Sequence, residues 1–268
     1  MQDSKQFHNF LIDYENKEVR FIWFTEKQLI LVCKFEKISL TTNENYVAEK
    51  ANNDVVITED KFYCSNISNV DDNFLCYDII LKEVELPNAV IIGKNFISSN
   101  MILDKIKLPN VKLIGDSFLS CNNSLKEIKL PKTTLIGNDF LSCNNSLKEI
   151  KLPNVNLIGD SFLMSNTILE KIELPNLVEM YDKFLYFNEI LKEIKLPNLQ
   201  EVGDDFLFYN SKLENIELPK LQEAGADFLY FNETLKEIKT PNLETVGFNF
   251  LYSNKNIKVK SKVYFETL

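Results

Sequence analysis

Five cysteines and a single histidine, His8, are the side chains of this chain best suited to nucleophilic or metal chemistry. Thiolates and imidazoles bind zinc or attack substrates when the fold brings several of them together. The number of cysteines is odd and no C-x-x-C pair occurs, so the sequence does not indicate a structural zinc site. It also lacks G-x-S-x-G, H-E-x-x-H and phosphate-binding glycine motifs. We therefore expect no enzyme activity, no metal and no cofactor.

Two of the cysteines, Cys121 and Cys143, stand 22 residues apart. This is also the period at which most of the sequence repeats, so the two thiols are expected in adjacent parallel units. Residues in phase in such units stack about 5 Å apart, a separation that allows a disulfide. Two free thiols in a ladder are the preferred interpretation, and a disulfide is the alternative.

A repeat of 22 residues runs without insertion or deletion from Leu81 to Asn256 and occurs eight times. A fixed period in the twenties is typical of a solenoid, in which each unit buries its apolar face against its neighbours. Positions are numbered below from the leading leucine of each repeat. We predict an N-terminal cap or small β-rich segment at 1–58, a degenerate capping repeat at 59–80, eight repeats at 81–256 and a C-terminal cap strand at 257–268.

Each repeat begins with a short alternating segment, such as Glu127-Ile128-Lys129-Leu130. Alternation of charged and apolar residues predicts a strand with one face in the core, and the invariant proline at position 7 ends it. Position 13 is glycine in seven of the eight repeats, which indicates a positive φ or close approach of another segment. Asp or Asn often follows and favours the start of a helical turn. Repeat five has Tyr181 at position 13, and we expect a local change of turn there.

Phenylalanine at position 16 and asparagine at position 20 are invariant among the repeats. A Phe-Leu or Phe-Ile pair at positions 16 and 17 suits the core side of a short helix, so the rings should stack into a spine along the solenoid. An asparagine amide both donates and accepts, so a stacked column can satisfy backbone groups where the chain turns. The predicted structural ladder includes Phe118, Phe140, Phe162, Asn122, Asn144 and Asn166.

Position 11 should point outward, because positions 9 and 12 are apolar and point inward. It is aliphatic only in the first four repeats, at Ile91, Leu113, Leu135 and Leu157. This aliphatic row is a candidate partner-binding surface, or else it lies under the N-terminal segment.

Position 18 changes in the opposite direction and becomes aromatic in the last four repeats, at Tyr186, Phe208, Tyr230 and Tyr252. Position 19 is aromatic in repeats five to seven. Two neighbouring aromatic columns do not easily share the core of so thin a unit, so we expect one of them at the surface. It would anchor a protein partner or stack on sugars; the alternative is that the larger rings fill a wider core.

The repeat resembles the BspA-like class of leucine-rich repeats. The matching residues are Leu125-x-x-Ile128-x-Leu130-Pro131, then Ile136-Gly137, then Phe140-Leu141-Ser142-Cys143. The resemblance implies an α/β solenoid, a right-handed superhelix with a parallel concave sheet and short helices or turns on the convex side. It also implies a bacterial or protist protein without shared catalytic residues, in a class with many surface proteins implicated in adhesion.

The net charge of −9 is spread over both signs and disfavours nucleic acid as a partner. The charges of the predicted strands largely neutralise one another, apart from a basic step at Lys107, Lys129 and Lys151. The chain has no apolar run long enough to span a membrane. Its first residues lack the order of a secretory signal, which favours the cytoplasm unless a leader was removed.

We therefore predict a non-enzymatic scaffold that binds a protein partner of unknown identity. A cell-surface adhesin that binds a host protein or glycan is the alternative. An enzyme with its site in residues 1–58 is the remaining hypothesis. The sequence does not indicate the oligomeric state.

Overall fold

The computed structural model describes residues 61–65, 67–76, 81–254 and 257–262, together with the strands β1 (Gln6–Phe7), β2 (Phe10–Asp13), β3 (Glu18–Phe21), β4 (Phe24–Thr25) and β5 (Val55–Ile57). The early strands form two small antiparallel pairs, β2 with β3 and β1 with β4. β5 runs antiparallel to the first strand of the solenoid. The role of residues 1–58 as a cap stays a prediction.

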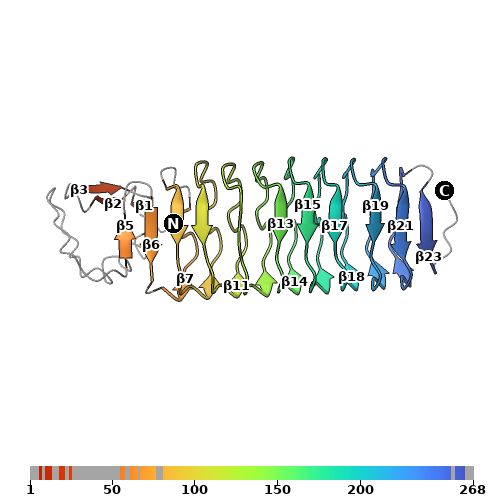
Figure 1. The fold of residues 1–268 in the computed structure, drawn as a ribbon, viewed down its shortest axis with the longest axis horizontal. Helices are drawn as coiled ribbons and strands as arrows, with labels where there is room; N and C mark the ends of the chain where they lie inside the picture. Colours follow the sequence, from red (N-terminus) through yellow and green to blue (C-terminus); the bar gives the residue numbers. More distant parts are fainter. Residues whose placement is uncertain are drawn as a thin grey trace, which may run out of the picture.

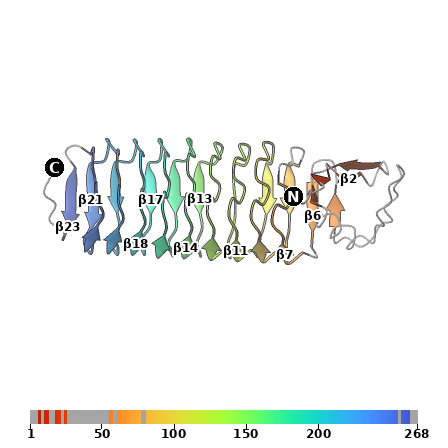
Figure 2. The same cartoon turned by 180° about the vertical axis from the view of Figure 1, so that it is seen from behind.

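The rest of the described chain is a stack of parallel coils, each shifted from the last by one 22-residue repeat (Figure 1; Figure 2 shows the opposite side). Each coil contributes strands to two rows. The first row contains β6 (Lys61–Cys64), β8 (Glu83–Glu85), β10 (Lys105–Lys107), β13 (Glu149–Lys151), β15 (Lys171–Glu173), β17 (Glu193–Lys195), β19 (Asn215–Glu217), β21 (Glu237–Thr240) and β23 (Lys258–Ser261). The second row contains β7 (Asn69–Val70), β9 (Ile91–Ile92), β11 (Leu113–Ile114), β12 (Leu135–Ile136), β14 (Leu157–Ile158), β16 (Glu179–Met180), β18 (Glu201–Val202), β20 (Glu223–Ala224) and β22 (Thr245–Val246).

The second row is one continuous nine-stranded parallel sheet. The first row is interrupted twice and forms three sheets, β5 to β10, β13 to β17 and β19 to β23. Repeat three, at Glu127–Lys129, forms no strand in the first row. The continuous second row therefore holds successive coils in register where the first row separates.

A column of phenylalanine rings forms the centre of the core. From Phe96 to Phe250 each ring stacks on the next, with centroids 5.0 to 5.6 Å apart and planes within 10° of parallel. Apart from Phe250, which is half-buried at the end of the stack, these rings are completely or almost completely buried. The column continues at Phe74 in the segment predicted as a degenerate repeat. Each coil thus buries its rings against its neighbours rather than within itself.

The predicted short helices are absent from the described residues, and this part of the fold prediction is wrong. Positions 15, 17 and 19 instead have positive φ in every repeat, for example 55° at Ser117, 53° at Leu119 and 59° at Cys121. The N–H of Leu119 donates to the preceding coil, at Phe96 O, and the N–H of Ser117 donates to the following coil, at Asn138 O. These bonds make a third ladder between coils. They replace the internal bonds of a one-turn helix, which is marginal by itself, and offset the roughly 1–2 kcal/mol cost of each left-handed residue.

The glycines at position 13 are required by close approach of successive coils, since none of them has a positive φ. A Cβ on Gly137 would lie 2.9 Å from backbone atoms of Gly115 and Asp116, closer than packed atoms tolerate. Gly159 and Gly203 donate their N–H groups to the preceding coil at 2.9 and 3.1 Å. Tyr181, which carries a side chain here, makes no such bond. The local change expected at repeat five is therefore a lost inter-coil hydrogen bond.

Two further columns join the coils by side-chain hydrogen bonds. The Asn144 Nδ2 donates to Leu119 O at 3.0 Å and to Ser142 O at 3.2 Å, and its Oδ1 accepts from the Asn122 N–H at 3.0 Å. The equivalent asparagines, including Asn166, donate in the same way. At position 14 the side chain does not begin a helix: the Asp116 carboxylate accepts the Asn138 N–H at 3.0 Å.

Candidate partner-binding surface

The aromatic residues at position 18 form a stacked column along repeats five to eight. Tyr186 stacks on Phe208, Phe208 on Tyr230 and Tyr230 on Tyr252, with centroids 4.6, 5.1 and 5.2 Å apart. The interplanar angles are 18°, 18° and 9°. The rings therefore cover one another's faces and leave their edges outward.

A second column, at position 19, packs beside the first. Phe187 and Tyr209 have centroids 5.2 Å apart and are tilted by 54°. The two columns meet edge to face, as at Tyr186 and Phe187, where the centroids are 4.5 Å apart and the planes are 88° from parallel. We call the combined surface the aromatic face. Its residues are Tyr186, Phe187, Phe208, Tyr209, Tyr230, Phe231 and Tyr252.

Both columns of the aromatic face lie at the surface, whereas the sequence predicts only one there. Phe187 is 36% exposed, Tyr209 38% and Tyr252 50%, and the other rings are half-buried. The core at this level is filled by the position-16 rings, so the aromatic face does not widen it. Positions 16 and 17 point inward together, and positions 18 and 19 point outward together.

The side chain at position 18 lies against the position-15 residue of the next coil. In the first repeats it is serine, and Ser120 Oγ donates to Asp139 O at 2.6 Å. The sequence alone did not single out position 15 as part of a site. In repeats six and seven it is Asp205 and Asp227, so two carboxylates border the aromatic rings.

The carboxylate of Asp205 is half-buried and poorly neutralised. Burial raises its pKa above the usual value, and the carboxylate of Asp227 raises it further, while Lys183 acts in the opposite direction. Burial also raises the pKa of Tyr186, with contributions from both carboxylates. Asp227 accepts a hydrogen bond from Asn249 Nδ2 at 2.8 Å. Among the described residues, no ion pair or side-chain hydrogen bond reaches the Asp205 carboxylate.

The aliphatic row lies in register on the second sheet, where Ile91, Leu113, Leu135 and Leu157 occupy adjacent strands. The first three of these side chains are each 39% exposed and the fourth is half-buried. Whether the row is an interface stays a prediction.

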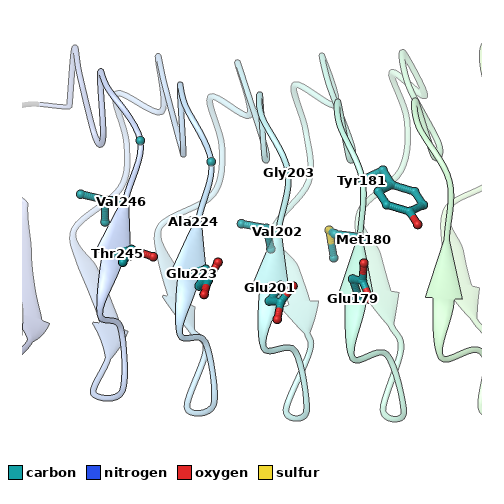
Figure 3. Close-up of a pocket in the computed structure, with 12 residues that line it drawn as sticks. Glu179, Met180, Tyr181, Glu201, Val202, Gly203, Glu223, Ala224, Thr245 and Val246 are labelled. Carbon is teal, nitrogen blue, oxygen red and sulfur yellow. The ribbon is translucent and has the colours of Figure 1, made fainter.

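Three glutamates continue the aliphatic row beyond repeat four. They line a shallow groove of about 420 Å³ on β16, β18 and β20. Figure 3 shows Glu179, Glu201 and Glu223 in a row, with the ring of Tyr181 at one end. Adjacent parallel strands lie about 4.8 Å apart, so like charges stand next to one another. In the part of the chain that the structure describes, no group of three or more His, Cys, Asp or Glu side chains is arranged to hold a metal ion.

The basic step on the first row is paired with carboxylates. Lys107 lies 2.8 Å from Glu85, and Lys129 lies 2.7 Å from Glu127. Lys151 likewise lies 3.0 Å from a glutamate of the next coil. These residues form a solvated, self-neutralising surface rather than a free cationic site.

Cys121 and Cys143 are both free thiols. Cys121 is exposed and Cys143 is half-buried. Burial raises the pKa of Cys143, and the neighbouring Cys121 raises it further. A raised pKa lowers the fraction of reactive thiolate, so the pair has no feature of a catalytic nucleophile.

The stack of 22-residue parallel coils, with its leucine, phenylalanine and asparagine columns, defines a leucine-rich repeat solenoid. The model of the BspA type leucine rich repeat region matches residues 68–189 and 157–265. The chain belongs to the BspA-type leucine-rich repeat family. No helix in the described residues is long and apolar enough to cross a membrane.

Solved structures share the fold. A leucine-rich repeat protein from Bacteroides ovatus is 23% identical, with a TM-score of 0.50 over 78% of this chain and 62% of that chain. This chain thus spans less than two thirds of the Bacteroides ovatus protein. A leucine rich cell surface protein from Faecalibacterium prausnitzii is 13% identical, with a TM-score of 0.33 over 73% of this chain and 86% of that chain. No curated protein matches the chain.

Proposed function

We propose that the chain is a non-enzymatic scaffold that binds a protein partner through the aromatic face. The observation that carries the proposal is the exposure of seven mutually packed rings where repeats one to three have serine, cysteine and serine-sized side chains. Tyrosine and other aromatic residues are enriched at protein interfaces, because they bury a large area at a small entropic cost. The repeat does not require these rings for its core, so their accumulation on one surface supports a binding role.

The ring geometry favours a protein over a glycan. A sugar stacks on an open ring face, but the faces of the position-18 rings are covered by their neighbours, as between Phe208 and Tyr230. Only Tyr252 ends the column and offers a face. Ring edges and hydroxyl groups suit side chains that insert between them, as in a protein interface.

A cell-surface adhesin is the second candidate, suggested by the BspA-type repeats themselves. It would use the same face to hold a host protein, and it requires export. We propose the cytoplasm as the location. Fractionation of the source cells, with antibody detection of this chain in the cytosolic and surface fractions, separates the two roles.

Partner capture by the purified chain tests the proposal. The variant Tyr186→Ser/Phe208→Ser/Tyr230→Ser places at position 18 the residue that Ser98, Ser120 and Ser142 already supply. Since serine fits this position, the variant should fold with the same circular dichroism spectrum. We expect it to lose the partners that the wild type retains.

The matched control is Ile91→Ser/Leu113→Ser/Leu135→Ser, which alters the aliphatic row. We expect this control to retain the partners. Loss of capture by the control alone would assign the partner to the aliphatic row. Equal capture by all three proteins would reject both surfaces.

A further inference from the structure

We propose that the segment bound by the aromatic face is basic as well as apolar, with lysine or arginine side chains placed beside Asp205 and Asp227. This inference rests on the proposed function and names the chemistry of the partner. It starts from one juxtaposition, in which two carboxylates border a column of stacked rings.

The register of the coils puts each carboxylate next to a ring. Position 18 of one coil lies against position 15 of the next, as the bond from Ser142 Oγ to Ser161 O at 2.8 Å shows in the first half. In the second half the same register places Tyr186 beside Asp205 and Phe208 beside Asp227. A side chain that packs on the ring edges therefore meets a carboxylate within the same contact.

The charge of the solenoid changes between its halves. Repeats one to four contain 8 acidic and 10 basic residues, whereas repeats five to eight contain 16 acidic and 9 basic residues. The aromatic face thus belongs entirely to the acidic half. A field of this sign attracts a basic segment and accelerates its association.

The unneutralised state of Asp205 selects against a purely apolar partner. Covering a half-buried carboxylate with an apolar surface removes its remaining water and leaves the charge unpaired, which is costly. An arginine or lysine supplies the missing countercharge, and its aliphatic stem packs on the rings. The tilted ring of Tyr209, which does not stack flat on Phe187, also offers part of its face to a cation.

The proposal is tested by selecting ligands from a phage-displayed library of random 12-residue peptides on the full chain. Selected peptides are then synthesised with a fluorescent label, and their binding is measured by anisotropy at low and high salt. Two variants are compared with the wild type. One is Tyr186→Ser/Phe208→Ser/Tyr230→Ser, which removes rings, and the other is Asp205→Asn/Asp227→Asn, which removes charge alone.

Asparagine is a native residue at position 15, as Asn95 and Asn249 show, so the charge variant should fold. We expect the selected peptides to combine lysine or arginine with apolar residues. Their affinity should fall by about tenfold or more in the charge variant and should weaken as salt is raised.

The outcomes separate the two proposals. Peptides that require the rings but carry no excess of basic residues would overturn the inference about charge and leave the proposed function intact. Basic peptides that bind the charge variant as tightly as the wild type would also overturn it. If every selected peptide binds the ring variant as tightly as the wild type, the aromatic face is not the binding surface and both proposals fail.

Discussion

The rings of Tyr186 and Phe208 lie flat against each other, with centroids 4.6 Å apart and planes 18° from parallel. This contact joins two successive coils on the outside of the solenoid, in parallel with the buried contact between Phe184 and Phe206 at 5.5 Å. The same 22-residue register therefore builds a core spine and a surface column. Because neighbouring rings hold each other in place, the surface is arranged before a partner arrives, and binding loses little side-chain entropy.

The two columns should differ in their contribution to stability. Phe140 is fully buried between Phe118 and Phe162, so Phe140→Ala should lower the free energy of unfolding by about 3–5 kcal/mol. Phe208→Ser alters a half-buried surface ring and should cost about 1 kcal/mol. Urea titration followed by circular dichroism measures both. A surface variant that is as damaging as the core variant would show that the surface rings serve mainly to hold the coils together.

The asparagine column should be as important as a core side chain. Asn144 is fully buried and makes three hydrogen bonds to backbone groups, so Asn144→Ala leaves these groups unpaired and should cost about 2–4 kcal/mol. The exposed Asn156 is the control, and Asn156→Ala should change stability by less than about 0.5 kcal/mol. Equal effects at the two sites, measured by urea titration, would contradict the ladder.

The glycine position should be intolerant of a side chain except in repeat five. Gly137→Ala forces a Cβ to within 2.9 Å of the preceding coil and should cost about 1–3 kcal/mol. Tyr181→Ala retains a Cβ where the coils already accommodate one, and it should cost about 0.5 kcal/mol or less. Hydrogen exchange provides a second measurement, because the Tyr181 amide lacks the inter-coil bond and should exchange faster than the amides of Gly159 and Gly203. Equal protection of the three amides would refute this account of the turn.

The repeat itself was predictable because each of its features depends on residue type at a fixed spacing. Proline at position 7 ends a strand by chemistry alone, and the alternation around Ile150 predicts which side faces the core. The BspA-type class and the parallel coils of 22 residues followed from these features and are confirmed. The period is informative because one error in it would turn every apolar residue of a strand to the wrong side.

The backbone of the third side was not predictable from residue type. Leu119 has a positive φ, which a leucine rarely adopts, and only the hydrogen bond to the preceding coil explains it. The glycines, in contrast, suggested positive φ and have none. Both outcomes depend on contacts with residues 22 positions away. The carboxylate of Asp205 escaped notice for the same reason, since its relation to Tyr186 exists only between coils.

Cysteine reactivity should reveal the same neighbour relation in the first half. Thiolates react with iodoacetamide, so the exposed Cys121 should be alkylated before Cys143, whose pKa is raised by burial and by Cys121. The buried Cys64 should react only after unfolding. In Cys121→Ser, a change to the residue found at Ser99, Cys143 should react faster because one cause of its raised pKa is gone. Mass spectrometry of timed samples at pH 8 measures these rates, and unchanged labelling of Cys143 in the variant would exclude the coupling.

The charge of Asp205 should make the wild type less stable at neutral pH than a neutral variant. Its pKa is raised in the folded protein by burial and by Asp227, so the folded state binds this proton more tightly than the unfolded chain does. Stability therefore falls as pH rises through the folded pKa, and the penalty is absent below the pKa of an unfolded aspartate, about 3.9.

Asp205→Asn should accordingly raise the free energy of unfolding at pH 7, and the difference from wild type should shrink towards zero as pH falls below about 4. Asp205→Ser is the matched control, since Ser117 and Ser161 occupy position 15 in the first half. Both neutral variants should show the same pH dependence if the charge is responsible. Urea titrations at several pH values measure this, and a difference from wild type that stays constant with pH would trace the effect to side-chain packing instead of charge.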